Sequence, residues 1–171
     1  MTPQQLFKGA PRTKKIIGDG HDEHWHQARF ITWCRDSARL QSDPIKRAAL
    51  EWLHSIPNGS YLYRTEGEGQ QRGKRRVPRQ ALKLIDEGLT AGIWDLRLDY
   101  VVLDEYNNIV TPGMIIEMKM DGRNLSDNQI AYGKFMQLQG FARAICINWK
   151  VAASAVVEYL ELTSFAVIPN F

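Results

Sequence analysis

The sequence predicts an α/β fold in which a mixed central β-sheet is flanked by α-helices. The first observation is a pair of runs rich in β-branched and aromatic residues, Leu96–Leu103 and Met114–Met120. They flank a polar break at Asp104–Asn108, which predicts a β-hairpin. The second observation is the order of patterns along the chain, helix, strands, helix, strand and helix, which requires helices on the faces of a sheet.

Length and charge favour one globular domain that can bind nucleic acid. The chain has 171 residues and a net charge of +3. Residues 1–20 are predicted to form an irregular basic arm, and residues 21–171 a single domain. Cys34 and Cys146 lie in apolar segments and are expected to be reduced core residues. No apolar run is long enough to span a bilayer, so we expect no membrane contact and a cytoplasmic location.

The first predicted helix begins at a cap formed by Asp22 or an adjacent residue and ends near Leu40. Glu23 lies in its first turn, where a negative charge favours the helix dipole. The residues expected to face the core form one stripe, Ala28, Ile31, Cys34 and Ala38, widened by Phe30 and Trp33.

Three histidines surround the start of this helix, at His21, His24 and His26. They suggest a zinc site, but no further Cys or His pattern completes four ligands. We therefore expect exposed first-turn histidines without zinc.

A short second helix and two short strands are expected next. Asp43-Pro44 reads as the start of a helix that continues to about Leu50. Strands are expected at Glu51–Ile56 and Tyr61–Thr65, on either side of a turn at Pro57-Asn58-Gly59.

A glycine-punctuated loop at Glu66–Arg76 carries four cations within five positions. It favours phosphate contacts, with a solvated loop as the alternative. Pro78 begins a helix to about Glu87, closed by Gly88. The predicted nucleic-acid-binding residues are Arg72, Lys74, Arg75 and Arg76 of the loop and Arg79 and Lys83 of the helix.

The C-terminal third predicts a capped helix, a strand and a last helix. Ser126 and Gln129 form a capping box, and Leu125 staples Ile130. The helix should end near Gly140. We expect it to bury Ile130, Ala131, Phe135 and Leu138, and we expect a strand at Ala142–Trp149 and a helix at Val151–Leu162.

The hairpin carries an unusual set of charges. Asp95 opens its first strand, and Glu117 and Lys119 share one face of its second strand with Ile115. The opposite face should enter the core through Met114, Ile116, Met118 and Met120. A solvated ion pair is one interpretation. Charges in a buried strand are more often paired, metal-bound or functional, so the pattern also fits a divalent metal beside a phosphate.

These motifs together resemble a known family. G-I-W-D-L, then I-E-M-K and then L-S-D-N-Q follow one another, after E-H-W-H-Q and I-P-N-G. In this order they are similar to the VRR-NUC domain of the PD-(D/E)xK nuclease superfamily, over about residues 22–162. The family usually has Pro before the aspartate, where this chain has Trp94.

The resemblance implies a restriction-endonuclease-like core and a Mg²⁺-dependent DNA endonuclease, with Mn²⁺ able to substitute. It implies that Asp95, Glu117 and the backbone carbonyl of Met118 bind the metal, and that Lys119 positions or helps deprotonate the attacking water. Glu23 and Gln129 would complete the site. Stand-alone domains of this size resemble bacterial and viral members associated with branched DNA, including Holliday junctions, in DNA repair. Such a protein would act in the cytoplasm of a bacterium or a virus-infected host cell.

Two further hypotheses concern assembly and the alternative function. A symmetric junction is cut on two strands, which favours a homodimer. The chain has five tryptophans, more than a small core needs, so some should be partly exposed, as at interfaces. The alternative function is a non-catalytic nucleic-acid-binding module on a nuclease fold.

Overall fold

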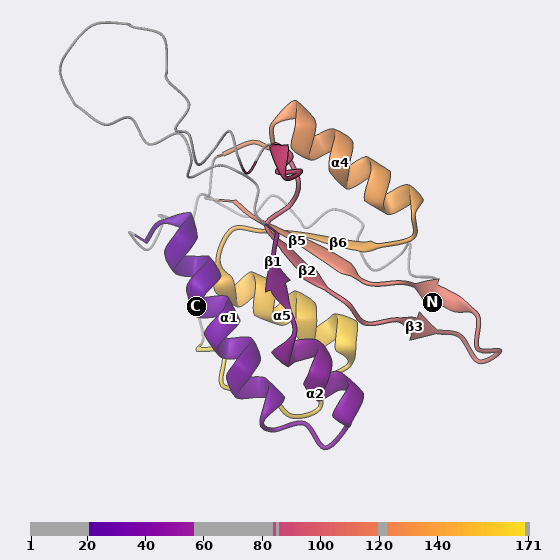
Figure 1. Ribbon diagram of the computed structural model, residues 1–171. Helices are drawn as coiled ribbons and strands as arrows, with labels where there is room; N and C mark the ends of the chain where they lie inside the picture. The colour runs from indigo at the N-terminus through magenta and orange to yellow at the C-terminus, as the bar shows by residue number, and fades with distance from the viewer. Residues whose placement is uncertain (1–20, 57–83, 85, 120–122, 170–171) are drawn as a thin grey trace, which may run out of the picture.

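A four-stranded mixed sheet forms the centre of the protein in a computed structural model that describes residues 21–56, 84, 86–119 and 123–169 (Figure 1). The strand order is β1-β2-β5-β6, with β1, β2 and β5 antiparallel and β5 and β6 parallel. The strands are β1 (His54–Ser55), β2 (Leu96–Leu98), β5 (Met114–Met118) and β6 (Ala142–Cys146). This confirms the predicted mixed sheet.

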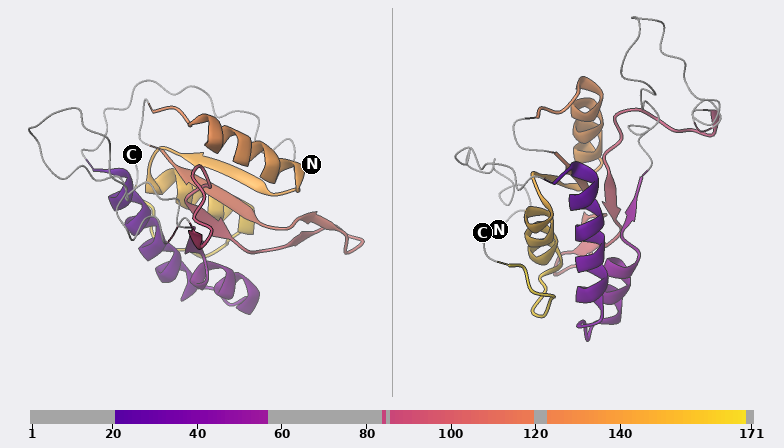
Figure 2. Two further views of the ribbon diagram at one scale, coloured as in Figure 1. Left: turned by 45° about the horizontal axis from the view of Figure 1, so that its top comes forward. Right: turned by 90° about the vertical axis from the view of Figure 1, so that its left-hand side faces the viewer.

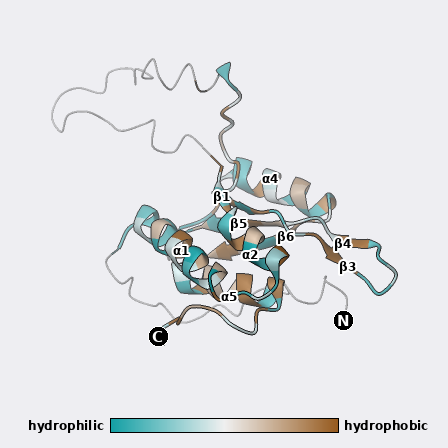
Figure 3. Ribbon diagram, turned by 60° about the horizontal axis from the view of Figure 1, so that its bottom comes forward, coloured by the Kyte–Doolittle hydropathy of each residue, from teal (hydrophilic) through white to brown (hydrophobic). Residues whose placement is uncertain are grey.

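The predicted hairpin is present, but each of its strands is divided in two. Strand β2 pairs with β5, and beyond a break the same two arms pair again as β3 (Val102–Leu103) and β4 (Ile109–Thr111). The turn between β3 and β4 is held by the Asp104 carboxylate, which accepts hydrogen bonds from the backbone N–H groups of Tyr106 and Asn108. In Figure 3 the strands β3 and β4 are coloured hydrophobic and the turn hydrophilic.

Helices cover both faces of the sheet (Figure 2). On one face lie α1 (Glu23–Ala38) and α5 (Trp149–Leu160), with α2 (Pro44–Glu51) packed against α1. On the other face lies α4 (Asp127–Leu138). Each of these four helices begins at a side chain that accepts hydrogen bonds from its first-turn N–H groups. These caps are Asp22, Asp43, Ser126 and Asn148, of which the first three were predicted.

The two faces of the sheet bury two separate apolar clusters. The larger joins α1, α2 and α5 to the sheet and receives Met114, Ile116 and Met118 from β5, as the alternation predicted. The smaller lies under α4 and consists of Trp94, Ile115 and Met136, with partly buried neighbours. Cys34 and Cys146 are both buried and free.

The buried face of α1 is rotated from the predicted stripe. Ala28 is exposed and Ile31 only half-buried, whereas His26 and Ser37 are buried together with Phe30, Trp33, Cys34 and Ala38. The reason is that α1 packs against both α2 and α5, so a wider part of its surface is buried than the single predicted stripe. His26 is 4% exposed, so the prediction of an exposed histidine was wrong at this position.

The predicted core face of α4 was also wrong. Ile130, Ala131, Phe135 and Leu138 are all exposed, and Leu138 retains 84% of its accessible surface. The buried residues are Gly133 and Met136. A Cβ atom added to Gly133 would lie 2.6 Å from the Trp94 ring, so this ring determines which side of α4 faces the sheet.

Smaller differences occur at the ends of elements. Strand β1 has only two residues because α2 continues to Glu51, and β6 ends at Cys146, so that Trp149 begins α5. Gly88 has a φ of 100°, which suits the helix end predicted there. The predicted turn at 57–59, the strand at 61–65, and most of the helix at 78–87 lie outside the described residues. Within the described part, no helix has the length and apolarity needed to cross a membrane.

Candidate metal centre

Three carboxylates converge at one end of the sheet. Glu23 lies in the first turn of α1, Asp95 immediately precedes β2, and Glu117 is the fourth residue of β5. One oxygen of each lies within 4.8 Å of the others. No other group of three His, Cys, Asp or Glu side chains comes as close in the described part of the chain.

Strand pairing places Asp95 beside Glu117. Leu96 pairs with Ile116 in the antiparallel β2–β5 ladder, so one further step in the register sets Asp95 opposite Glu117. The backbone of Asp95 is held by β1, because its carbonyl accepts the N–H of Ile56 at 2.8 Å. Its carboxylate accepts the N–H of Met118 at 2.9 Å. Asp95 is 8% exposed, and its carboxylate therefore has a defined orientation toward β5.

Glu117 is fully buried, and only part of its charge is balanced by hydrogen bonds. Its Oε1 accepts hydrogen bonds from the Gln129 amide and from Lys119 Nζ at 3.4 Å. Its Oε2 is buried and has no hydrogen-bond partner among the described residues. Burial and the nearby Asp95 carboxylate raise the pKa of Glu117 to about 8, against the opposing effect of Lys119. A cation bound beside Oε2 would favour the ionised carboxylate and lower this pKa again.

Glu23 reaches the site from the opposite face of the sheet. The Asp22 cap accepts the N–H of Trp25 at 2.8 Å and fixes the first turn of α1, so Glu23 projects over the end of β5. Burial raises the pKa of Glu23, with the Lys119 charge acting in the opposite direction. The guanidinium of Arg123 lies 4.0 Å from the Glu23 carboxylate. Arg123 was not predicted, and its position in the loop after Lys119 was the only signal for it.

Lys119 and Gln129 connect the carboxylates to α4. The Lys119 backbone N–H donates to the Cys146 carbonyl at 2.8 Å, so β6 holds the residue just beyond β5. Its Nζ lies 3.3 Å from Gln129 Oε1. The same oxygen accepts the N–H of Ser126 at 2.9 Å and completes the predicted capping box. Gln129 therefore caps α4 and contacts Glu117 at the same time.

Trp94 holds the backbone of α4 at Gln129. It occupies the position where the resembled family has Pro. Its Nε1–H donates to the backbone carbonyl of Gln129 at 2.9 Å, and it is 1% exposed. Gly133, one turn further along α4, leaves the space that the indole fills. Glycine within a helix is unfavourable by about 1 kcal/mol relative to alanine, which is the signal that could have identified this contact.

The remaining sequence-predicted residues fall into two groups. The side chain of Met118 enters the main core, and its N–H holds Asp95; the metal-binding role of its carbonyl stays a prediction. The six predicted nucleic-acid-binding cations, Arg72, Lys74, Arg75, Arg76, Arg79 and Lys83, lie outside the described residues.

The histidines at the start of α1 form an aromatic cluster. The His21 ring stacks on Trp25 at 3.7 Å, and His26 meets Trp25 edge-on at 5.1 Å. His24 faces another side of α1. None of the three belongs to the carboxylate group.

The donor set fits a hard divalent cation. Mg²⁺ binds carboxylate oxygens and retains waters, and does not need nitrogen or sulfur ligands. A buried Glu117 oxygen without a hydrogen bond, beside two further carboxylates, is a suitable ligand for such an ion. Glu23, Asp95 and Glu117 could therefore hold one.

Comparison with known proteins identifies the fold. No protein-family model and no curated protein matches the sequence. Among solved structures, the chain is similar to a "VRR_NUC domain protein", with 18% sequence identity and a TM-score of 0.56. The match covers 88% of this chain and 98% of that one. The resemblance predicted from the motifs is thus confirmed at the level of the fold, over nearly the whole of the other chain.

Proposed function

We propose that this protein is a Mg²⁺-dependent nuclease that hydrolyses phosphodiester bonds in DNA. The observation that carries the proposal is the buried, incompletely neutralised Glu117 between two other carboxylates, Asp95 and Glu23, with Lys119 beside it. The similarity in fold to a VRR_NUC domain protein supports the same activity.

The carboxylates of Glu23, Asp95 and Glu117 would hold the metal, with the Met118 carbonyl as the further ligand that the resemblance implies. Bound Mg²⁺ or Mn²⁺ polarises a phosphoryl oxygen and lowers the pKa of bound water. The pKa of Glu117 indicates that the site gains affinity for such an ion as its proton leaves.

The protein's own groups would orient the reactants. Lys119 Nζ, held between Glu117 and Gln129, offers a cation for a phosphate oxygen and positions the attacking water. Gln129 keeps the Lys119 ammonium and the Glu117 carboxylate together from α4. Trp94 holds the Gln129 backbone, so the site is supported by the packing of α4 on the sheet.

The preferred substrate and the assembly belong to the same proposal. We place the basic loop on DNA phosphates and favour branched DNA, such as a four-way junction, as the substrate. We also propose a homodimer, so that two copies offer two sites to two strands. Trp25 is 38% and Trp52 78% exposed, as expected for tryptophans available to an interface. Light scattering that gives a monomer mass with and without junction DNA would exclude the dimer.

The direct experiment is cleavage of supercoiled plasmid and of a labelled substrate panel that includes duplex, single strand, flap, four-way junction and RNA. Metal-dependent cleavage is expected with Mg²⁺ and Mn²⁺ and none with EDTA. Asp95→Asn should bind DNA as the wild type does but not cut it. If the wild type binds nucleic acid yet cuts no member of the panel with either metal, the alternative of a non-catalytic binding module replaces the nuclease.

A further inference from the structure

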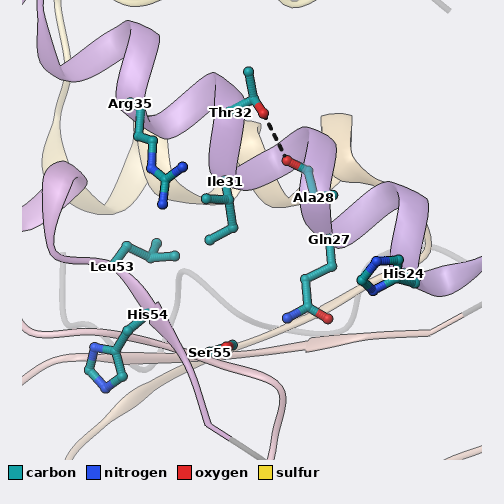
Figure 4. Close-up of a pocket in the computed structure, with 9 residues that line it drawn as sticks. All are labelled: His24, Gln27, Ala28, Ile31, Thr32, Arg35, Leu53, His54 and Ser55. Carbon is teal, nitrogen blue, oxygen red and sulfur yellow. Dashed lines mark hydrogen bonds between the residues drawn. The ribbon is translucent and has the colours of Figure 1, made fainter. Parts of the chain in front are cut away.

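A groove runs between α1 and the strand β1 (Figure 4). Its volume is about 490 Å³. Six of its nine described lining residues are polar or cationic, and none of the nine is acidic. The polar ones are His24, Gln27, Thr32, Arg35, His54 and Ser55. A groove whose described lining is polar and without acids is suited to a different part of the substrate than the metal-bound phosphate.

Both walls of the groove are close in sequence or hydrogen bonding to residues of the metal centre. On α1, Gln27 lies four residues after Glu23, so the two side chains are neighbours on the helix surface. On the other wall, β1 leads into Ile56, whose N–H binds the carbonyl of Asp95 at 2.8 Å. Arg35 lies twelve residues beyond Glu23, about 18 Å along the helix axis. A strand cleaved at the carboxylates would therefore continue into this groove.

The lining matches the chemistry of a nucleic-acid strand. Arg35 is exposed and forms no ion pair with a carboxylate in the described part of the chain, so its guanidinium can bind a phosphate with two N–H groups. His24 and Gln27 of α1 and Ser55 of β1 supply further polar contacts, whereas the His54 ring points away from α1 (Figure 4). The half-buried side chain of Ile31 adds an apolar contact for a base.

The size of the groove selects between single and double strands. Pockets of roughly 300–1,000 Å³ enclose a molecule of drug size, which is comparable to a nucleotide. The groove, at about 490 Å³, therefore has room for an unpaired nucleotide rather than for stacked base pairs.

We infer that this groove binds an unpaired strand of nucleic acid next to the scissile phosphate. The inference rests on the proposed nuclease function and narrows the branched substrates proposed above to those with a single-stranded segment adjoining the bond that is cut, rather than a fully paired four-way junction.

The test measures binding in EDTA, where no cleavage occurs. The full chain is titrated against a fluorescein-labelled 12-nucleotide single strand and the matching blunt duplex. Arg35→Ala is compared with Arg29→Ala, which removes the same charge from the same helix on the side facing the Trp149 ring, 5.6 Å away. Arg35→Ala should raise the Kd for the single strand several-fold, because one phosphate contact is lost. The same loss should lower the slope of log K against log salt concentration by about 0.7. Arg29→Ala should leave both Kd and slope unchanged.

Either of two results would overturn the inference: equal effects of the two variants, or a larger effect of Arg35→Ala on the duplex than on the single strand. A second readout uses the four histidines of the chain. In NMR titrations with the unlabelled single strand, the ring signal of His24 should shift, while those of His21, His26 and His54 stay in place. The reverse pattern would place the strand on the other side of α1.

The nuclease proposal and the groove can fail separately. If the wild type cuts no substrate but the Arg35 and histidine effects are observed, the groove proposal stands and the nuclease proposal fails. Cleavage without any Arg35 effect retains the nuclease and removes the groove.

Discussion

The two faces of β5 are built for different purposes. On one face, Met114 and Ile116 enter a large apolar cluster with α1 and α5. On the other, Ile115 belongs to a cluster of three buried residues, among those described, under α4, and Glu117 next to it is fully buried with one oxygen that lacks a hydrogen-bond partner in the described part of the chain. The larger cluster supplies the apolar burial that stabilises the domain. That stability allows the α4 side to hold a carboxyl group whose ionised form is unfavourable without its ligand.

The largest expected effect is on cleavage, and substitutions of two adjacent residues of β5 distinguish the roles of its two faces. Glu117→Gln should lower cleavage at least roughly 100-fold, beyond the 10–100-fold loss typical of residues that only support a metal ligand. Ile116→Ala should instead lower the free energy of unfolding by about 2–5 kcal/mol and retain cleavage per folded molecule. Cleavage assays and urea unfolding of both variants measure the two effects. Near-normal cleavage by Glu117→Gln would remove Glu117 from the centre.

The next effect is the pH dependence of the metal-free protein. The pKa of Glu117 is raised from 4.5 to about 8 by burial, so the folded state retains a proton that the unfolded state releases. This contribution to stability is complete below pH 4.5 and is lost as pH rises toward 8. In EDTA at pH 8, Glu117→Gln should therefore unfold at a higher temperature than the wild type. The gain should be several degrees, because 1 kcal/mol shifts Tm by about 2–4 °C at this size.

Mg²⁺ should reverse the difference in Tm between the wild type and Glu117→Gln. Addition of Mg²⁺ at pH 8 should raise the Tm of the wild type and leave Glu117→Gln almost unchanged, since binding to the folded state alone stabilises it. Thermal scans of both proteins at pH 5 and pH 8, each with and without Mg²⁺, measure these differences in Tm. Equal responses of both proteins to Mg²⁺ would place the ion elsewhere.

A smaller effect tests how α4 is positioned. Gly133→Ala should destabilise the protein by about 1–3 kcal/mol, because the added Cβ would lie 2.6 Å from the Trp94 ring. Helix propensity alone predicts the opposite sign, a gain of up to about 1 kcal/mol. Lys134→Ala, at the exposed neighbouring position, is the control and should be close to neutral. A stabilised Gly133→Ala would mean that the indole does not determine the position of α4.

Local signals in the sequence were sufficient for caps, turns and the alternation of β5. The capping box of Ser126 and Gln129 and the Asp22 cap depend on neighbours within one helical turn, so their spacing predicts them directly. The convergence of Asp95 and Glu117 followed from the hairpin pattern. The position of Glu23 beside them required the resemblance, because α1 packs on the opposite face of the sheet.

Contacts between distant segments explain what the sequence pattern missed. The exposed side of α4 carries more large apolar residues than its buried side, so periodicity indicated the wrong face. The buried side is selected by Trp94, about 40 residues earlier in the chain, through the space at Gly133. The groove beside α1 was likewise invisible, because its two walls come from α1 and β1 and meet only in the folded protein.

The smallest expected effect is on the outer side of α4. Leu138 is 84% exposed, so Leu138→Gln should change the free energy of unfolding by no more than about 0.5 kcal/mol. Met136, two residues earlier and 6% exposed, is the matched control, and Met136→Ala should destabilise by about 2–5 kcal/mol. Urea unfolding at micromolar concentration measures both variants. If Leu138→Gln is as destabilising as Met136→Ala and its effect grows with protein concentration, another copy of the chain covers this side of α4 in solution. A concentration-independent loss at Leu138 would instead mean that α4 packs on the sheet through the face that periodicity predicted.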